Sequence, residues 1–401
     1  MINNVILGQS GGPTCVINAS LCGLIQAAQA AQNMGRVFGM RYGIEGFIND
    51  EIIDLDAELT ETINQLRHTP SSALGSCRYK LQDSDLPLIL ARFKRYNIRY
   101  CFLIGGNDTM ETICRIERYC QKNNYDFIGV GVPKTVDNDL YGTDHAPGFA
   151  SAAKYIALST QQSGQLARDM QRVDQYLIHQ TVGRDAGWLA ASASLARQKP
   201  EDAPHLIYMP ERKMSKAQFI SDVNDCVKRY GWASIVCGEG VVWDDGTLVS
   251  ASDIKDGFHN VERGAKGGVS AAINLHKIIR EATGMRGEFQ VSESLAMCAI
   301  DRVSAIDAEE AYQCGKKAVE LGAAGISGVM VSIRRNKSEN YAVSLTSISL
   351  HEVARKTRNM PDHFINEAGN DVTQAFTDYL RPLVGRLDGC TSLAFKDVAD
   401  A

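Results

Sequence analysis

Short apolar segments recur along the chain, and each leads into a glycine-rich or polar turn and then a helical pattern. Residues 4–7 (NVIL), 100–104 (YCFLI) and 127–130 (FIGV) are three such segments. Continuous apolar runs of this length are typical of strands buried on both faces. Apolar residues at helical spacing over 14–31 indicate a covering helix. The pattern therefore predicts an α/β fold with mostly parallel sheets covered by helices.

The length of 401 residues favours two lobes in one continuous body, because no Gly/Ser/Pro-rich linker divides the chain. We expect two Rossmann-like lobes. Their expected ranges are residues 1–145 and 146–335, with part of the second range returning to the first lobe. We interpret residues 336–401 as a helical extension.

Charge and composition exclude several classes of function. The net charge is −5 and no Lys/Arg block stands out, so we expect neither a nucleic-acid nor a membrane partner. No apolar run reaches the roughly 18–20 residues that span a bilayer. The first residues lack a basic region and a cleavage site, which makes the cytoplasm the expected compartment. The 11 cysteines show no CxxC pair and no zinc spacing, and this pattern favours reduced, mostly buried thiols.

Three polar loops follow predicted strands, where open α/β sheets bind their ligands. The first is 8–12 (GQSGG). Paired glycines let backbone N–H groups approach a phosphate at a helix N-terminus, although a purely structural turn has the same composition. The loop is neither a Walker A motif nor GxGxxG, so a P-loop and a dehydrogenase lack their signatures.

The second loop, 105–109 (GGNDT), combines glycines with oxygen ligands that suit phosphate and Mg²⁺. A helix N-cap at Asn107 or Asp108 is the alternative. The third loop, 133–139 (PKTVDND), carries two carboxylates and one lysine. A carboxylate can accept a hydroxyl proton during phosphoryl transfer, and a lysine can neutralise the transferring group. A solvated turn is the alternative there.

With 181–184 (TVGR), these loops resemble the phosphofructokinase family in order and spacing. The segments 75–78 (GSCR), 143–149 (TDHAPGF), 209–211 (MPE) and 238–240 (GEG) agree, and the resemblance runs from about residue 3 to 335. PKTVDND is its most specific part. The resemblance implies the phosphofructokinase fold, a reversible glycolytic phosphotransferase activity, Mg²⁺ and a homodimer or homotetramer.

The resemblance also implies roles for individual residues. Asp137 would be the general base, with Lys134, Asp108 and Arg78 beside the transferring group. The donor would be bound by Gly11, Gly12, Gly106 and Thr109. The acceptor would be bound by Thr135, Val136, Asp139, Val182, Gly183, Arg184, Glu239 and Arg302. Asn107 stands where the family usually has a Mg²⁺-binding Asp.

The donor is predicted from two positions. ATP-using members resemble GGDG and PGTID, whereas this chain has Asp108 and Lys134 at the two glycine positions. That combination resembles the members that use diphosphate. A carboxylate at Asp108 would repel the α-phosphate of ATP, and Lys134 would add positive charge for the leaving group.

The acceptor is predicted less directly. The family acceptor is fructose 6-phosphate, but Gln175 and Met297 stand where phosphate-binding arginines are expected. Arg286 or Arg302 would then have to compensate. The alternative is a diphosphate-dependent kinase of a non-phosphorylated sugar or polyol. A regulatory paralogue without activity is a further alternative, which the retained Asp137 and Lys134 disfavour.

Two features near these loops have simpler interpretations. His145 and His179 flank the site and are interpreted as core or cap histidines with satisfied hydrogen bonds. Residues 308–321 (AEEAYQCGKKAVEL) form an amphipathic pattern whose charges we assign to a solvated face.

Overall fold

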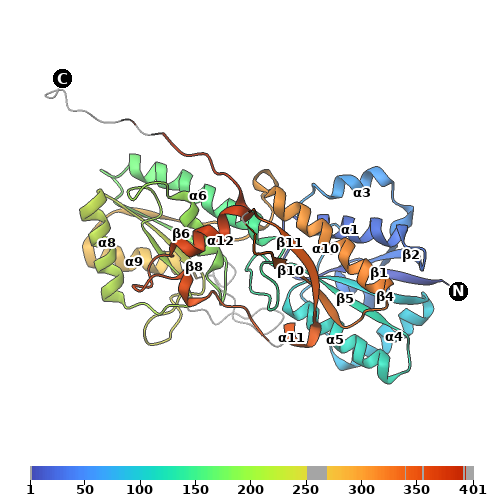
Figure 1. Cartoon of the computed structure of the whole chain (residues 1–401). Coiled ribbons are helices and arrows are strands. Elements are labelled where there is room, and N and C mark those ends of the chain that lie inside the picture. Colours follow the sequence, from blue (N-terminus) through green and yellow to red (C-terminus); the bar gives the residue numbers. More distant parts are fainter. Residues whose placement is uncertain (1, 251–268, 339, 355, 392, 394–401) are drawn as a thin grey trace.

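The computed structural model describes residues 2–250, 269–338, 340–354, 356–391 and 393. Within these residues the chain forms two lobes, each built on its own sheet (Figure 1). The first sheet has seven strands, which in spatial order are β11 (Val343–Ser349), β10 (Val329–Arg335), β5 (Ile128–Pro133), β4 (Ile98–Gly105), β1 (Asn3–Gln9), β2 (Met34–Met40) and β3 (Ile52–Asp54). Its pairs are parallel, except β10–β11 and β2–β3 at its two edges.

Helices cover both faces of this sheet. They are α1 (Ile17–Ala30), α2 (Gly43–Ile48), α3 (Thr60–Leu66), α4 (Leu86–Arg95), α5 (Asn107–Lys122), α10 (Ala305–Ala323) and α11 (Leu350–Val353). Successive side chains of β1 point to opposite faces: Val5 and Leu7 pack with α1 and α10, and Ile6 packs with α4 and α5. Burial on both faces explains why this strand has no polar alternation.

The second sheet is parallel and has four strands in the order β7 (Leu206–Tyr208), β8 (Ala233–Gly238), β6 (Tyr176–Thr181) and β9 (Gly287–Val291). Its lobe also contains α6 (Phe149–Asp169), α7 (Trp188–Ser192), α8 (Lys216–Tyr230), α9 (Ala271–Thr283) and α12 (Gln374–Val384). The predicted α/β class with mostly parallel sheets is confirmed. The helix expected over 14–31 begins only at Ile17.

The interpretation of 336–401 as a helical extension was wrong for the described part of that range. Strand β11 pairs antiparallel with β10 in the first sheet, and only then does α12 pack on the second lobe. Val343 and Leu345 alternate with outward-facing residues, which is the period of a strand half-covered by a core. The range 394–401 lies outside the described residues. Thus the chain returns to the first lobe at α10, β10 and β11, and α12 then packs on the second lobe (Figure 1).

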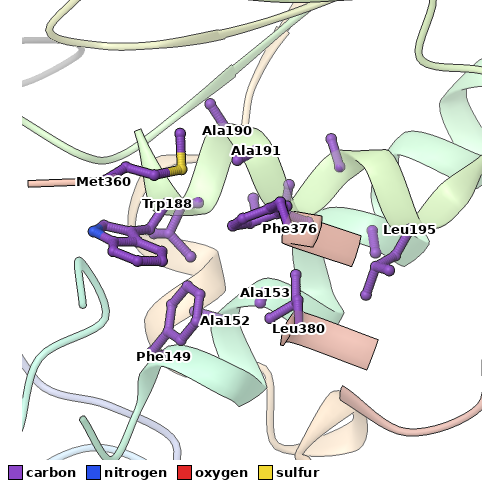
Figure 2. Packing of buried hydrophobic residues seen from close by; sticks show 14 of the residues in the cluster. Phe149, Ala152, Ala153, Trp188, Ala190, Ala191, Leu195, Met360, Phe376 and Leu380 are labelled. Atoms are coloured by element: carbon purple, nitrogen blue, oxygen red, sulfur yellow. The ribbon is translucent and has the colours of Figure 1, made fainter. Parts of the chain in front are cut away.

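A buried aromatic cluster fixes α12 to the second lobe. Trp188 and Phe149 meet edge to face with ring centroids 6.1 Å apart, and Phe376 and Leu380 of α12 lie against the same group (Figure 2). Phe376 and Leu380 are fully buried. The C-terminal segment is therefore part of the core and not an appendage.

The assignment of the charges over 308–321 to a solvated face was wrong for Glu310, which is buried. Its carboxylate accepts a hydrogen bond from the Tyr341 hydroxyl and lies 2.6 Å from Nε2 of His145. Burial alone would lower the pKa of His145, but its hydrogen bonds with Asp144 and Glu310 raise it above the usual value. As predicted, His145 is a core histidine with satisfied hydrogen bonds, and His179 contacts Thr160 and Ser292 in the same way.

We predict that Phe376→Ala lowers the free energy of unfolding by about 3–5 kcal/mol, because it removes a fully buried ring and leaves a cavity. Urea unfolding followed by circular dichroism measures the change. Leu393→Ala, at a residue that is 79% exposed, is the control and should change it little. A loss below about 1 kcal/mol for Phe376→Ala would show that α12 is not part of the core.

Candidate active site

The three polar loops meet at one cavity. Residues 10–13 follow β1, 106–109 follow β4 and 134–139 follow β5, and these strands are neighbours in the first sheet. The cavity has a volume of about 410 Å³. Residues from the second lobe line its other wall, so the site lies between the two lobes. Parallel strands bring residues far apart in sequence to one edge, as the sequence predicted.

Lys134 ties the third loop to the first. Its ammonium donates to the carbonyl oxygen of Gly12 at 2.7 Å, and its side chain is almost fully buried. Burial lowers its pKa to about 8, although Asp137 and Asp139 act in the opposite direction. Gly11 has φ +77°, and a side-chain Cβ there would lie 3.2 Å from the Lys134 nitrogen. A glycine at this position therefore leaves the ammonium room beside the loop.

The second loop opens helix α5. Gly106 is the N-cap without a side-chain cap hydrogen bond, so neither Asn107 nor Asp108 is the capping residue. Both lie in the first turn and line the cavity, together with Thr109. At Gly105 a Cβ would fall 2.0 Å from the Thr109 hydroxyl, so this turn requires glycine. The positive end of the helix dipole faces the cavity and favours an anion there.

Asn107 fits a cation site. Its side-chain oxygen is buried and has no hydrogen-bond partner in the structure, which is costly unless something else contacts it. Mg²⁺ prefers oxygen ligands and keeps several waters, so one amide oxygen plus diphosphate oxygens is a plausible set. Among the described residues no cluster of three or more His, Cys, Asp or Glu could hold a metal. The chemistry of Asn107 is therefore compatible with Mg²⁺ delivered with a diphosphate.

Asp137 and Asp139 form the acidic centre. Burial raises the pKa of Asp137, and the neighbouring carboxylates of Asp139 and Glu239 raise it further. Burial also raises the pKa of Asp139, against a hydrogen bond from Thr135 that favours its ionised form. The Asp137 backbone N–H donates to the Thr135 hydroxyl at 3.1 Å. A carboxyl with a raised pKa is suited to take up a proton near neutral pH.

The second lobe supplies the opposite wall. Val182 and Arg184 follow β6 and line the cavity, and Glu239 follows β8. Gly183 adjoins them with φ +128°, and its N–H donates to a Glu239 carboxylate oxygen at 3.3 Å. With Asp185 and Glu293, this wall brings one guanidinium and three carboxylates to the cavity.

The structure brings together nearly all of the residues singled out in the sequence. Those that line the cavity are Gly11, Gly12, Arg78, Gly106, Asn107, Asp108, Thr109, Lys134, Thr135, Val136, Asp137, Asp139, Val182, Arg184 and Glu239. Arg302 does not line it, because its guanidinium donates to Ser159 and Gln162 on α6. Arg302 is therefore absent from this chain's own cavity, and its assignment to the acceptor site stays a prediction.

Gln175 and Arg286 lie at the other end of the second sheet. Gln175 precedes β6, and the Arg286 N–H donates to its side chain at 3.1 Å, whereas the cavity adjoins the carboxyl end of β6. Arg286 therefore cannot replace a missing arginine in this chain's own cavity. Met297 lines the cavity, and it stands where the resemblance to the family led us to expect a phosphate-binding arginine.

Sequence reasoning missed Asp185, Ala186, Glu293, Ser294 and Thr357, which all line the cavity. Asp185 directly follows the TVGR segment, and this adjacency is the sequence signal that could have identified it as a site residue. Glu293 and Ser294 lie on a short 3₁₀ helix after β9, and Glu293 has a left-handed φ of +37°. Thr357 comes from the C-terminal segment, which carries no motif. Their positions depend on contacts between lobes and not on local patterns.

Comparison with known proteins agrees with this geometry. The family model described as phosphofructokinase matches residues 4–321. The chain belongs to the phosphofructokinase family. It is 37% identical to the pyrophosphate–fructose 6-phosphate 1-phosphotransferase of Halomonas elongata over 95% of this chain and 92% of that protein.

Other relatives extend this picture. The crystal structure of the pyrophosphate-dependent phosphofructokinase from Marinobacter aquaeolei superposes with a TM-score of 0.86 at 36% identity, covering 99% of this chain and 94% of that one. The chain is also 33% identical to a sulfofructose kinase of Alkalicoccus urumqiensis, over 95% of each protein. Family membership excludes the dehydrogenase interpretation.

We predict that Asp137→Asn raises the melting temperature, by an amount that grows with pH. The folded state holds the Asp137 proton more tightly than the unfolded chain does. Stability is therefore lost as pH rises from the ordinary carboxyl pKa of about 4 toward the raised folded value, and Asn avoids this loss. Calorimetry from pH 5 to 8.5 measures the difference from the wild type. Asp225→Asn, at an exposed site on α8, should show no such trend. A variant less stable than the wild type at every pH would contradict the assigned electrostatics.

Proposed function

We propose that the chain is a diphosphate–fructose-6-phosphate 1-phosphotransferase, which reversibly transfers a phosphoryl group from diphosphate to the 1-hydroxyl of fructose 6-phosphate. The observation that carries the proposal is the pair Asp108 and Lys134 at the donor end of the cavity. A carboxylate at the start of α5 repels the additional phosphate of ATP. The buried Lys134 ammonium offsets part of the negative charge of a diphosphate. Relatives named for this activity cover almost the whole chain.

The donor would lie along the glycine loops after β1 and β4, close to the N-terminus of α5. Backbone N–H groups near Gly11 and Gly106 would contact its oxygens, and Lys134 and Arg78 would neutralise the charge that develops on the leaving phosphate. Asn107 would hold Mg²⁺, which supplies further charge neutralisation when bound. Lys134 is preorganised for this role, because its hydrogen bond to Gly12 already fixes its nitrogen beside the first loop.

The acceptor would lie against Asp137. Its hydroxyl oxygen attacks the terminal phosphorus, the bridging P–O bond breaks, and the hydroxyl proton passes to the Asp137 carboxylate, while orthophosphate leaves. Thr135, Asp139, Arg184 and Glu239 would hold the sugar hydroxyls. The raised pKa of Asp137 makes it a stronger base than an exposed aspartate once it is ionised.

Compartment and assembly complete the proposal. Among the described helices none is long and apolar enough to cross a bilayer. We propose that the enzyme acts in the cytoplasm and that it forms a homodimer or homotetramer. Sedimentation of the purified protein measures its oligomeric state.

The donor assignment predicts turnover with diphosphate and fructose 6-phosphate, and none with ATP. Formation of fructose 1,6-bisphosphate with each donor measures this, and Asp137→Asn is the matched inactive control, with a loss of about 10²–10⁴-fold. Asp108→Gly should lower diphosphate turnover without creating ATP use, because one substitution does not build an adenine site. ATP-dependent turnover without diphosphate-dependent turnover would overturn the proposal.

A second acceptor is favoured by the charges at the acceptor end. Asp185, Glu239 and Glu293 line it, whereas Arg184 is the cation that the second lobe contributes among the described residues. Met297 stands where the resemblance to the family implies an arginine, and its sulfur lies 3.8 Å from the Cβ position of Gly12 on the first loop. An acidic wall of this kind suits the hydroxyl groups of a non-phosphorylated sugar or polyol better than a phosphate. The acceptor named for the relative from Alkalicoccus urumqiensis also differs from fructose 6-phosphate.

A panel of acceptors with diphosphate as donor distinguishes the two candidates. We expect kcat/KM to be highest for fructose 6-phosphate, compared with sedoheptulose 7-phosphate, fructose, inositol and hexitols. If a neutral polyol is preferred instead, Met297→Arg should raise kcat/KM for fructose 6-phosphate about 10–100-fold, because one charge-assisted phosphate contact contributes about 1.5–3 kcal/mol. The variant Met297→Leu controls for the loss of the thioether. No turnover with any acceptor would favour a regulatory paralogue.

A further inference from the structure

The C-terminal segment reaches the loop that carries the proposed base. Thr357 pairs with Leu140 in an antiparallel bridge, and the Arg358 N–H donates to the Asp139 carbonyl at 2.8 Å. The family model matches only up to residue 321, so this contact comes from a part of the chain beyond that match. The segment thus continues past the first sheet and passes directly behind the acidic centre.

Arg358 contacts the loop through its side chain as well. One guanidinium nitrogen donates to the carbonyl oxygen of Asn138 at 3.2 Å. The guanidinium carbon lies 4.2 Å from the centre of the Trp188 ring, and the Trp188 N–H donates to the Arg358 carbonyl at 3.4 Å. Trp188 is fully buried in the core of the second lobe (Figure 2). A rigid ring therefore fixes the orientation of the guanidinium that holds Asn138.

Tyr379 of α12 contacts the side chain of Asn138. The Asn138 amide donates to the Tyr379 hydroxyl at 3.3 Å, and that hydroxyl donates to the Asp144 carbonyl at 2.9 Å. The other end of the amide accepts from the Ala146 N–H at 3.1 Å. Arg335 lies over the Tyr379 ring at 4.4 Å and forms an ion pair with Asp144. The buried Asn138 is therefore held at both its side chain and its carbonyl.

Asn138 requires such support. It lies between Asp137 and Asp139 and has φ +55°, a left-handed conformation that costs free energy for a residue other than glycine. The carboxylates on either side of it are both partly buried and repel each other when both are ionised. A loop with these properties relaxes toward solvent unless surrounding contacts hold it. Arg358 and Tyr379 supply contacts from outside the loop.

We propose that Arg358 and Tyr379 are positioning residues, which hold Asp137 at the acceptor hydroxyl by fixing the left-handed Asn138. The proposal rests on the proposed function, because it gives Asp137 its role as base. A displaced base slows proton transfer while the glycine loops still bind the donor. Removing either contact therefore lowers kcat and leaves the KM for diphosphate nearly unchanged.

Three variants test the proposal. Arg358→Ala should lower kcat by about 10–100-fold, since a displacement of about 1 Å at a reacting group has effects of this size. Arg358→Lys, which keeps the charge and can still reach a carbonyl, should restore part of the loss. Tyr379→Phe removes the hydroxyl that contacts Asn138 but keeps the ring. It therefore tests the support of the same loop without leaving a void in the core. Arg386→Ala, at an exposed arginine of the same segment, is the control. An unchanged kcat in folded Tyr379→Phe and Arg358→Ala overturns the proposal.

Hydrogen exchange separates this proposal from the proposed function. Amides of residues 135–146 should exchange faster in Tyr379→Phe and Arg358→Ala than in the wild type, while those of the β1 and β4 strands stay protected. This readout requires no turnover. Faster exchange in both variants, together with a wild type that proves inactive, would uphold the role of Arg358 and Tyr379 in fixing the loop and reject the proposed function. Unchanged exchange in both variants, with an active wild type, would reject the positioning role alone.

Discussion

The placement of two partly buried carboxylates on one short loop is the constraint on which the rest of the site depends. Asp137 and Asp139 lie on one loop between two lobes, with Lys134 as the nearest fixed cation of that loop. Placing charges of the same sign close together is unfavourable. The Thr135 hydroxyl hydrogen-bonds to Asp139, and contacts from distant segments hold the left-handed Asn138 between the two carboxylates. The result is a proposed base whose pKa is raised, in a cavity that both lobes line.

The two ends of the cavity differ in charge, and this difference assigns their roles. Lys134, Arg78 and the N-terminus of α5 make the end at the glycine loops favourable for a compact anion. The end formed by the second lobe is more acidic. In the proposed reaction the phosphoryl group passes from the positive end of the cavity to a hydroxyl of the acceptor. The carboxylates of the acidic end would hold that acceptor by accepting hydrogen bonds from its hydroxyl groups. Specificity for the donor comes from this chain's own loops, whereas specificity for the acceptor depends on the wall supplied by the second lobe.

Connections between the lobes make the C-terminal segment part of the catalytic architecture. It adds β11 to the first sheet, passes Thr357 and Arg358 behind the base loop, and ends with α12 in the core of the second lobe. The buried Glu310–His145 contact connects α10 to the loop that follows the base. Both connections join elements far apart in sequence, so the position of Asp137 depends on contacts from outside its own loop.

The sequence by itself determined the α/β class, the three loops after β1, β4 and β5, and the residues on them, because apolar runs and glycine turns are local patterns. It also predicted the donor from Asp108 and Lys134. Only the tertiary structure decided that Arg302 is bound to α6, that Glu310 is buried and that Arg358 and Tyr379 contact Asn138. These facts depend on which segments meet after the chain folds, and no spacing within one segment encodes that meeting. A charged residue on an amphipathic helix has the same local pattern whether it faces water or a buried histidine.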